Sequence, residues 1–260
     1  MKNNTIINAV IFDLSGTLVD YGSLATIITM RKTFQSKGIK ITNEIIKKDM
    51  GIKKKIHIKR ILNNPLVKSK WFEKYNSSIK KKEFENLCLE FDKLLPIIVK
   101  KNLNIIPNVK KIIKFLKKNN IKIGITTGYP KKITKIILNF LNSKKIFVDC
   151  CVCVDEVKNG RPKPDMCLKN LKQLKIYNPK KCIKVDDSIS GITEGRKAKM
   201  ITVGLVSTGI QMGLSKSEYK KMNKSKLKNK ITKIKKEFKS FNADLVVNNL
   251  YDFERILKKN

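Results

Sequence analysis

Polar residues stand where several apolar runs of the sequence end, and together they could act on a phosphoryl group. They are Asp13 after AVIF, Thr127 at the end of IKIGITT, Asp186 and Asp187 after CIKV, and Arg161 in the loop NGRPKPD. Carboxylates, a hydroxyl and a guanidinium that meet at one place suit a hard divalent cation and a phosphoryl group. In such a site Asp13 would attack phosphorus, while the cation and Arg161 neutralise charge on the phosphoryl oxygens.

The segments that carry these residues alternate between strand and helix patterns. From about residue 101 onward, helical periodicity separates apolar runs that are typical of strands: IKIGITTG, IFVDCCVCV, CIKVDDS, ITVGLVS and ADLVV. This alternation predicts an α/β fold with a doubly wound, Rossmann-like parallel sheet, whose carboxyl edge would gather the polar residues. The run NTIINAVIFD predicts a first strand rather than a signal peptide.

A helical block separates the first strand from the others. Between about Asn43 and Val99 the apolar residues keep helical spacing without a strand-like run, and LATIITMRKTFQSKGI before them predicts a helix that ends at Gly38. We therefore predict two domains. Residues 1–21 and 101–260 form the parallel-sheet core, and residues 22–100 form an all-helical cap domain that is inserted after the first strand.

The formal net charge of +37 is extreme and raises the question of a nucleic-acid partner. Lysine accounts for nearly all of it, with 53 lysines against 5 arginines, although arginine is the better reader of phosphates and base edges. Lys, Ile and Asn are abundant along the whole chain, as a compositional drift would produce. We therefore expect no specific nucleic-acid partner. No apolar stretch approaches the length of a membrane span, so we expect no membrane partner.

The six cysteines do not indicate a zinc site. Cys150, Cys151 and Cys153 fall in an apolar run without a nearby histidine, and the remaining cysteines lie in apolar contexts. Buried, reduced thiols in a cytoplasmic protein are the favoured interpretation.

Four motifs resemble those of the haloacid dehalogenase-like superfamily. FDLSGT is similar to its nucleophile motif, TTG to the second motif, GRPKP to the third and VDDS to the metal-binding fourth. Within the superfamily, the chain most resembles the phosphonoacetaldehyde hydrolase (phosphonatase) family, also through DMGIKKKIHIKRI, EGRKAKM and TVGLVSTG. This resemblance implies Mg²⁺-dependent hydrolysis of phosphonoacetaldehyde to acetaldehyde and phosphate, and a possible homodimer through the cap.

The residue two positions after Asp13 agrees with that family. Phosphatases of the superfamily commonly have a second Asp there, which protonates the leaving alkoxide, whereas this chain has Ser15, a poor acid. In the resembled family the leaving group is carbon. A lysine condenses with the substrate aldehyde, and the protonated imine accepts the electron pair as phosphorus moves to the aspartate.

The resemblance implies that Lys54 is the Schiff-base lysine and that His57 assists imine formation. About one residue in five is lysine, so Lys53 or Lys55 could take the role if the helix register differs, but His57 is the only histidine. On one helix Lys54 and His57 would share a face, with Met50 one turn earlier, beside the substrate or in the cap core. We expect the like charges of Lys53 and Lys55 to lower the pKa of Lys54.

The resemblance also implies the phosphoryl and metal ligands. Thr127 and Gly128 would hold the phosphoryl oxygens together with Arg161. Asp13, the backbone carbonyl of Ser15, and Asp187 would hold Mg²⁺.

The fourth motif departs from the family pattern, which has Gly before its key Asp and a second Asp four residues after it. Here Asp186 and Gly191 take those positions. We expect the missing carboxylate to lower Mg²⁺ affinity unless Asp186 replaces part of its charge. Two other functions stay open. One is a phosphate-monoester phosphatase on the same fold, and the other is a non-catalytic basic binding protein.

Overall fold

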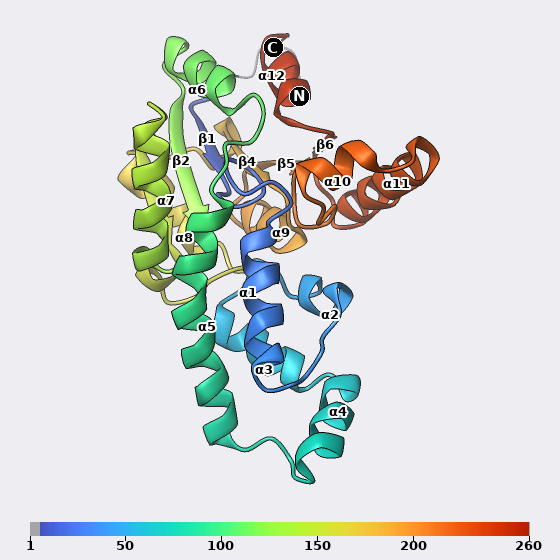
Figure 1. Cartoon of the computed structure of the whole chain (residues 1–260). Helices are drawn as coiled ribbons and strands as arrows, with labels where there is room; N and C mark the ends of the chain where they lie inside the picture. Colours follow the sequence, from blue (N-terminus) through green and yellow to red (C-terminus); the bar gives the residue numbers. More distant parts are fainter. Residues whose placement is uncertain (1–5, 260) are drawn as a thin grey trace.

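The computed structural model describes residues 6–259 (Figure 1). The start of the predicted first strand and the question of a signal peptide concern residues 1–5, which lie outside this range. Within it, no helix has both the length and the apolar character needed to cross a membrane. The cysteines are free thiols.

A parallel sheet of six strands forms the centre of the described chain. Its strands are β1 (Ala9–Phe12), β2 (Lys122–Thr127), β3 (Cys150–Cys153), β4 (Cys182–Asp186), β5 (Ile201–Leu205) and β6 (Leu245–Val247), in the order β3-β2-β1-β4-β5-β6. β1 lies between β2 and β4, with Phe12 opposite Ile125 and Val185. All four β1 residues are buried, as expected of a central parallel strand. The predicted doubly wound α/β fold is confirmed.

Helices cover both faces of the sheet because successive strand residues point to opposite sides. Val10 and Phe12 pack on the side of α6 (Val109–Lys118), α7 (Lys131–Ser143) and α12 (Leu250–Leu257). Ala9 and Ile11 pack on the other side, with α8 (Asp165–Gln173) and residues that follow α9 (Ile189–Lys197). The lysine-rich segment near the C-terminus forms α10 (Lys216–Lys221) and α11 (Lys224–Ser240), and α11 adds Ile234 and Phe238 to the core.

Between Leu24 and Asn102 the described chain is helical, as the spacing of its apolar residues predicts. The helices are α1 (Leu24–Gln35), α2 (Asn43–Lys47), α3 (Lys54–Leu62), α4 (Pro65–Tyr75) and α5 (Lys81–Asn102), and α6 follows before β2. In Figure 1, α1 to α4 lie together beyond one end of the sheet, and the long α5 runs from them toward α7. Asn64 starts α4 because its side chain accepts a hydrogen bond from the Leu66 N–H, and Pro65 takes the first helical position.

One helix begins later than the sequence pattern indicated. Met50 and Lys54 do not share a helix, because α3 begins at Lys54 and Met50 lies in the preceding turn. Gly51 has a φ of 88°, a left-handed conformation that ends any helix running through Met50. Lys54 and His57 do lie in the same helix.

Candidate active site

The polar strand ends meet where the order of the strands reverses. From β1 the chain builds the sheet outward through β2 and β3 on one side, and through β4 to β6 on the other. Asp13 follows β1, and Asp186 ends β4, so both lie at this switch point. Open parallel sheets bind ligands in the crevice at such a point.

Asp13 and Asp187 line one small pocket together with residues from the helical segment. Its cavity volume is about 40 Å³, and its polar lining includes Ser15, Thr127, Arg161 and Lys54. The pocket therefore brings strand-end residues and a residue of α3 together.

The turn after Asp13 fits only because residue 16 is glycine. Gly16 has a φ of 89°, and a Cβ atom there would overlap the Ser23 hydroxyl and the Asp187 carboxylate. The Ser23 Oγ lies 2.9 Å from the Ser15 carbonyl oxygen and 3.1 Å from Asp187 Oδ2. Ser23 thus links two of the expected Mg²⁺ ligands.

Three carboxylates at the strand ends fit a divalent cation: Asp13 and Asp187 line the pocket, and Asp186 lies beside them. One oxygen each of Asp13, Asp186 and Asp187 lie within 4.8 Å of one another, and all three residues are buried. Burial and the charges of Asp13 and Asp186 raise the pKa of Asp187 well above its usual range. Burial and the charge of Asp186 raise the pKa of Asp13 to about 6, against the opposing effect of Arg161. A hard cation among these oxygens would relieve the repulsion between them.

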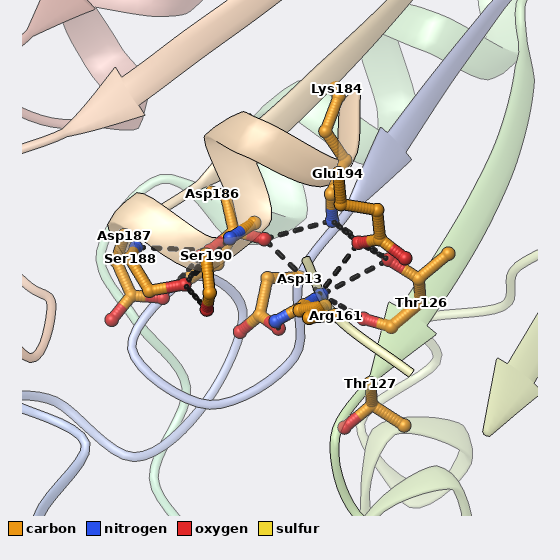
Figure 2. A network of polar contacts seen from close by, with 12 residues as sticks. Asp13, Thr126, Thr127, Arg161, Lys184, Asp186, Asp187, Ser188, Ser190 and Glu194 are labelled. Carbon is orange, nitrogen blue, oxygen red and sulfur yellow. Dashed lines mark hydrogen bonds and ion pairs between the residues drawn. The ribbon is translucent and has the colours of Figure 1, made fainter. Parts of the chain in front are cut away.

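Arg161 lies at the centre of the polar network in Figure 2. Its Nε donates to Glu194 Oε2 at 2.8 Å, its Nη1 to Asp13 Oδ1 at 2.7 Å, and its Nη2 to the Thr126 carbonyl oxygen at 2.9 Å. The side chain is only 2% exposed. These bonds fix the guanidinium beside Asp13, where it can neutralise charge on a phosphoryl oxygen.

Lys54 extends from the start of α3 into the same pocket as Asp13. Burial lowers its pKa from 10.5 to about 8; Asp13 opposes this shift and Arg161 adds to it. The direction agrees with the prediction, but the cause is different, because burial and not the charge of Lys53 or Lys55 lowers the pKa. The Lys54 Nζ lies 6.0 Å from the centre of the Tyr129 ring.

The two neighbouring lysines point elsewhere. Lys53 Nζ donates to the Lys158 carbonyl oxygen at 3.0 Å, and Lys55 is exposed. Neither lines the pocket, whereas Lys54 does.

His57 is fully buried one turn after Lys54 but does not line the pocket. Its Nε2 is 2.8 Å from the Ile46 carbonyl oxygen, so Nε2 carries the proton, and Nδ1 has no hydrogen-bond partner. Burial, and then the charge of Lys54, lower its pKa to about 3, against the hydrogen bond to Ile46. His57 is therefore a neutral ring behind Lys54.

The remaining expected residues lie where the helical segment meets the sheet. Met50 lines the pocket, and its carbonyl oxygen accepts a hydrogen bond from Ser190 Oγ at 3.0 Å. Thr127, the last residue of β2, and Gly128 after it line the pocket. A Cβ atom at Gly128 would come within 2.8 Å of the Gly51 carbonyl oxygen, so the two segments approach closely here.

Comparison with known proteins identifies the family. The profile of the haloacid dehalogenase-like hydrolases matches residues 7–199, which include every strand from β1 to β4. The chain belongs to the haloacid dehalogenase-like hydrolases.

The similarity of this hydrolase to phosphonoacetaldehyde hydrolases extends over nearly its whole length. It is 31% identical over 252 residues to the phosphonoacetaldehyde hydrolase of Bacillus cytotoxicus, covering 97% of this chain and 96% of the relative. With the enzyme of that name from Bacillus anthracis it shares 32% over 253 residues, at the same coverage. A phosphonoacetaldehyde hydrolase-like protein from Oleispira antarctica has a crystal structure that matches with a TM-score of 0.93 and 28% identity, covering 97% of this chain and 92% of that one. The resemblance noted in the motifs is confirmed.

Several residues of the hydrolase's site could not be found from the sequence. Two of these residues, Lys184 and Glu194, are fully buried beside Arg161. Lys184 Nζ donates to Thr126 Oγ1 at 2.8 Å and lies 3.9 Å from Glu194 Oε2. Glu194 belongs to the motif EGRKAKM, which was the one available signal. Asp20, whose carboxylate accepts from Ser15 Oγ at 2.7 Å, had none.

We expect Arg161→Lys to lower the free energy of unfolding by about 2–4 kcal/mol. Lysine keeps the charge but cannot serve three partners at once, so Glu194 or Asp13 loses a buried hydrogen bond. Urea denaturation measures the change. The exposed Arg255→Lys is the control and should change stability by less than about 0.5 kcal/mol. Equal effects of the two variants would contradict the prediction.

Proposed function

We propose that this hydrolase cleaves the carbon–phosphorus bond of phosphonoacetaldehyde, giving acetaldehyde and phosphate. The observation that carries the proposal is that Lys54 and Asp13 line one pocket. An amine that can form an imine and a carboxylate that can attack phosphorus thus face the same small space. The names of the relatives support the same substrate, a small phosphonate.

The first half of the reaction belongs to Lys54. With a pKa of about 8, part of the Lys54 side chain is a neutral amine near neutral pH, and it attacks the aldehyde carbon. Loss of water gives a protonated imine. In this proposal His57 assists imine formation from one turn behind Lys54 in α3, as a neutral buried ring whose Nδ1 has no hydrogen-bond partner.

The second half belongs to Asp13. Its carboxylate attacks phosphorus, and the electron pair of the C–P bond moves into the imine, which becomes an enamine on Lys54. Arg161, Thr127 and the Gly128 N–H hold the phosphoryl oxygens. Protonation and hydrolysis of the enamine free acetaldehyde, and water cleaves the aspartyl-phosphate.

Mg²⁺, held by Asp13, the Ser15 carbonyl oxygen and Asp187, would supply positive charge to the phosphoryl oxygens during the transfer. Residues 22–100 act in this proposal as a cap that closes over the sheet edge and excludes water from the imine.

Borohydride reduction tests the proposal. The protein is treated with sodium borohydride in the presence of phosphonoacetaldehyde, and its peptides are mapped by mass spectrometry. A mass increase on Lys54 is the expected result, since reduction converts the imine into a stable amine. Labelling confined to Lys53 or Lys55, or no labelling, would refute the assignment.

The rate should rise with pH until Lys54 is deprotonated. Because the neutral amine attacks the aldehyde and the Lys54 pKa is about 8, kcat/KM should increase with pH up to about 8 and then level off, with a steeper rise near pH 6, where Asp13 also loses its proton. Initial rates of phosphate release across this range measure the profile, with exposed Lys55→Ala expected to give the same curve. A rate that is independent of pH from 6 to 9 would contradict a lysine nucleophile.

The two alternatives predict different behaviour. A phosphate-monoester phosphatase would hydrolyse p-nitrophenyl phosphate, and this activity would persist in Lys54→Ala. A non-catalytic binding protein would bind polyanions tightly after loss of Asp13 and would turn over neither substrate.

A further inference from the structure

The carboxylate of Asp186 fills the space beside Gly191. Gly191 lies in the first turn of α9, and a Cβ atom there would overlap both carboxylate oxygens and the Cγ of Asp186. No side chain larger than hydrogen fits at residue 191 while Asp186 keeps its position. The space therefore holds either the carboxylate of Asp186 or a side chain on residue 191, but not both.

Asp186 is held firmly in this position. Its Oδ1 accepts from the Ser188 N–H at 2.9 Å and from Ser188 Oγ at 2.7 Å. Its Oδ2 lies 2.9 Å from Lys184 Nζ and 3.2 Å from Arg161 Nη2. Ser188 Oγ in turn accepts from the Gly191 N–H at 3.1 Å, so the start of α9 is built around the carboxylate (Figure 2).

The charge of Asp186 matters for a cation. The buried groups around Arg161 are four carboxylates and two cations: Asp13, Asp186, Asp187 and Glu194 against Arg161 and Lys184. In their charged forms they carry an excess of two negative charges, which a divalent cation would balance. Without Asp186 the excess would be one, and one of the three oxygens that lie within 4.8 Å of one another would be lost.

We propose that Asp186 supplies the third carboxylate of the cation site from the end of β4, and that residue 191 is glycine because it must leave that carboxylate room. Asp186 and Gly191 are then a matched pair. The inference rests on the proposed function in one respect only, namely that the site binds Mg²⁺.

Mg²⁺ binding to four variants tests the pair, measured by isothermal titration calorimetry on the full chain without substrate. Asp186→Asn keeps the volume but removes the charge and should raise the Kd at least about tenfold. Asp186→Gly and Gly191→Asp should each weaken binding at least as much. The double variant Asp186→Gly/Gly191→Asp should bring the Kd back to within about threefold of the unchanged protein, because the carboxylate returns from the other side.

Leu116→Ala separates a loss of stability from a loss of the carboxylate. Leu116 is fully buried in α6, which packs against β2 and α12, so the truncation should lower Tm and leave the Kd for Mg²⁺ unchanged. The inference is overturned if Asp186→Asn binds Mg²⁺ as tightly as the unchanged protein, if the double variant binds no better than Asp186→Gly, or if the unchanged protein binds no Mg²⁺. Borohydride labelling of Lys54 needs no metal, so it reports on the proposed function separately.

Discussion

Lys54→Ala is expected to lower the rate of phosphate release from phosphonoacetaldehyde by at least about 10³-fold. Without the amine no imine forms, and the C–P electron pair has no acceptor. Lys54→Arg should be equally inactive, because a guanidinium stays protonated and cannot attack the aldehyde. Coupled detection of acetaldehyde and of phosphate measures both products.

The adjacent lysine provides the matched control for this result. Lys55 is next in the chain and exposed, so Lys55→Ala should keep the rate within about twofold of the unchanged protein. Turnover of phosphonoacetaldehyde by Lys54→Ala at a tenth of the original rate or more would rule out the lysine mechanism.

Asp13→Asn is expected to have the largest effect of all, a loss of at least about 10⁴-fold in phosphate release. The amide is not a nucleophile toward phosphorus, and it also removes one of the three carboxylates near the cation. The variant should still be labelled by borohydride at Lys54, since imine formation does not need Asp13. Loss of turnover with retained labelling would divide the reaction into its two halves.

Asp92→Asn is the control for the carboxylate. Asp92 is exposed on α5 and does not line the pocket, so this change should leave the rate nearly unaltered. If Asp13→Asn released phosphate at a rate near that of Asp92→Asn, Asp13 would not be the nucleophile.

The sheet and the position of the site could be predicted because both follow from local patterns. A strand that is buried on both faces has a continuous apolar sequence, and β1 shows this clearly. Parallel strands end at one edge, so acidic residues at the ends of two neighbouring strands, β1 and β4, must lie close together. Asp13, Asp186 and Asp187 therefore could be grouped before any coordinates were known.

The support around the site could not be predicted, since polar residues in helices and strands ordinarily indicate a surface. Lys184 alternates with apolar residues in β4 and Glu194 lies in a polar helix, yet both are completely buried because each is paired with an opposite charge. Likewise, no local pattern distinguishes Lys54 from Lys53 and Lys55. The three side chains differ in where they point, which depends on how α3 is oriented at its first residue, Lys54. The left-handed turn at Gly51 sets that orientation.

The small volume of the pocket has a consequence for how molecules reach it. A volume of about 40 Å³ has room for a few waters and not for a phosphonate together with its aldehyde arm. We therefore expect admission of substrate to separate Ser190 from the Met50 carbonyl and Gly128 from Gly51. The connection at residues 20–23, with positive φ at Asp20, Gly22 and Ser23, is where we expect the backbone to bend. Each turnover would then include one opening and one closing of the pocket, and the imine on Lys54 would exist only while the pocket is closed.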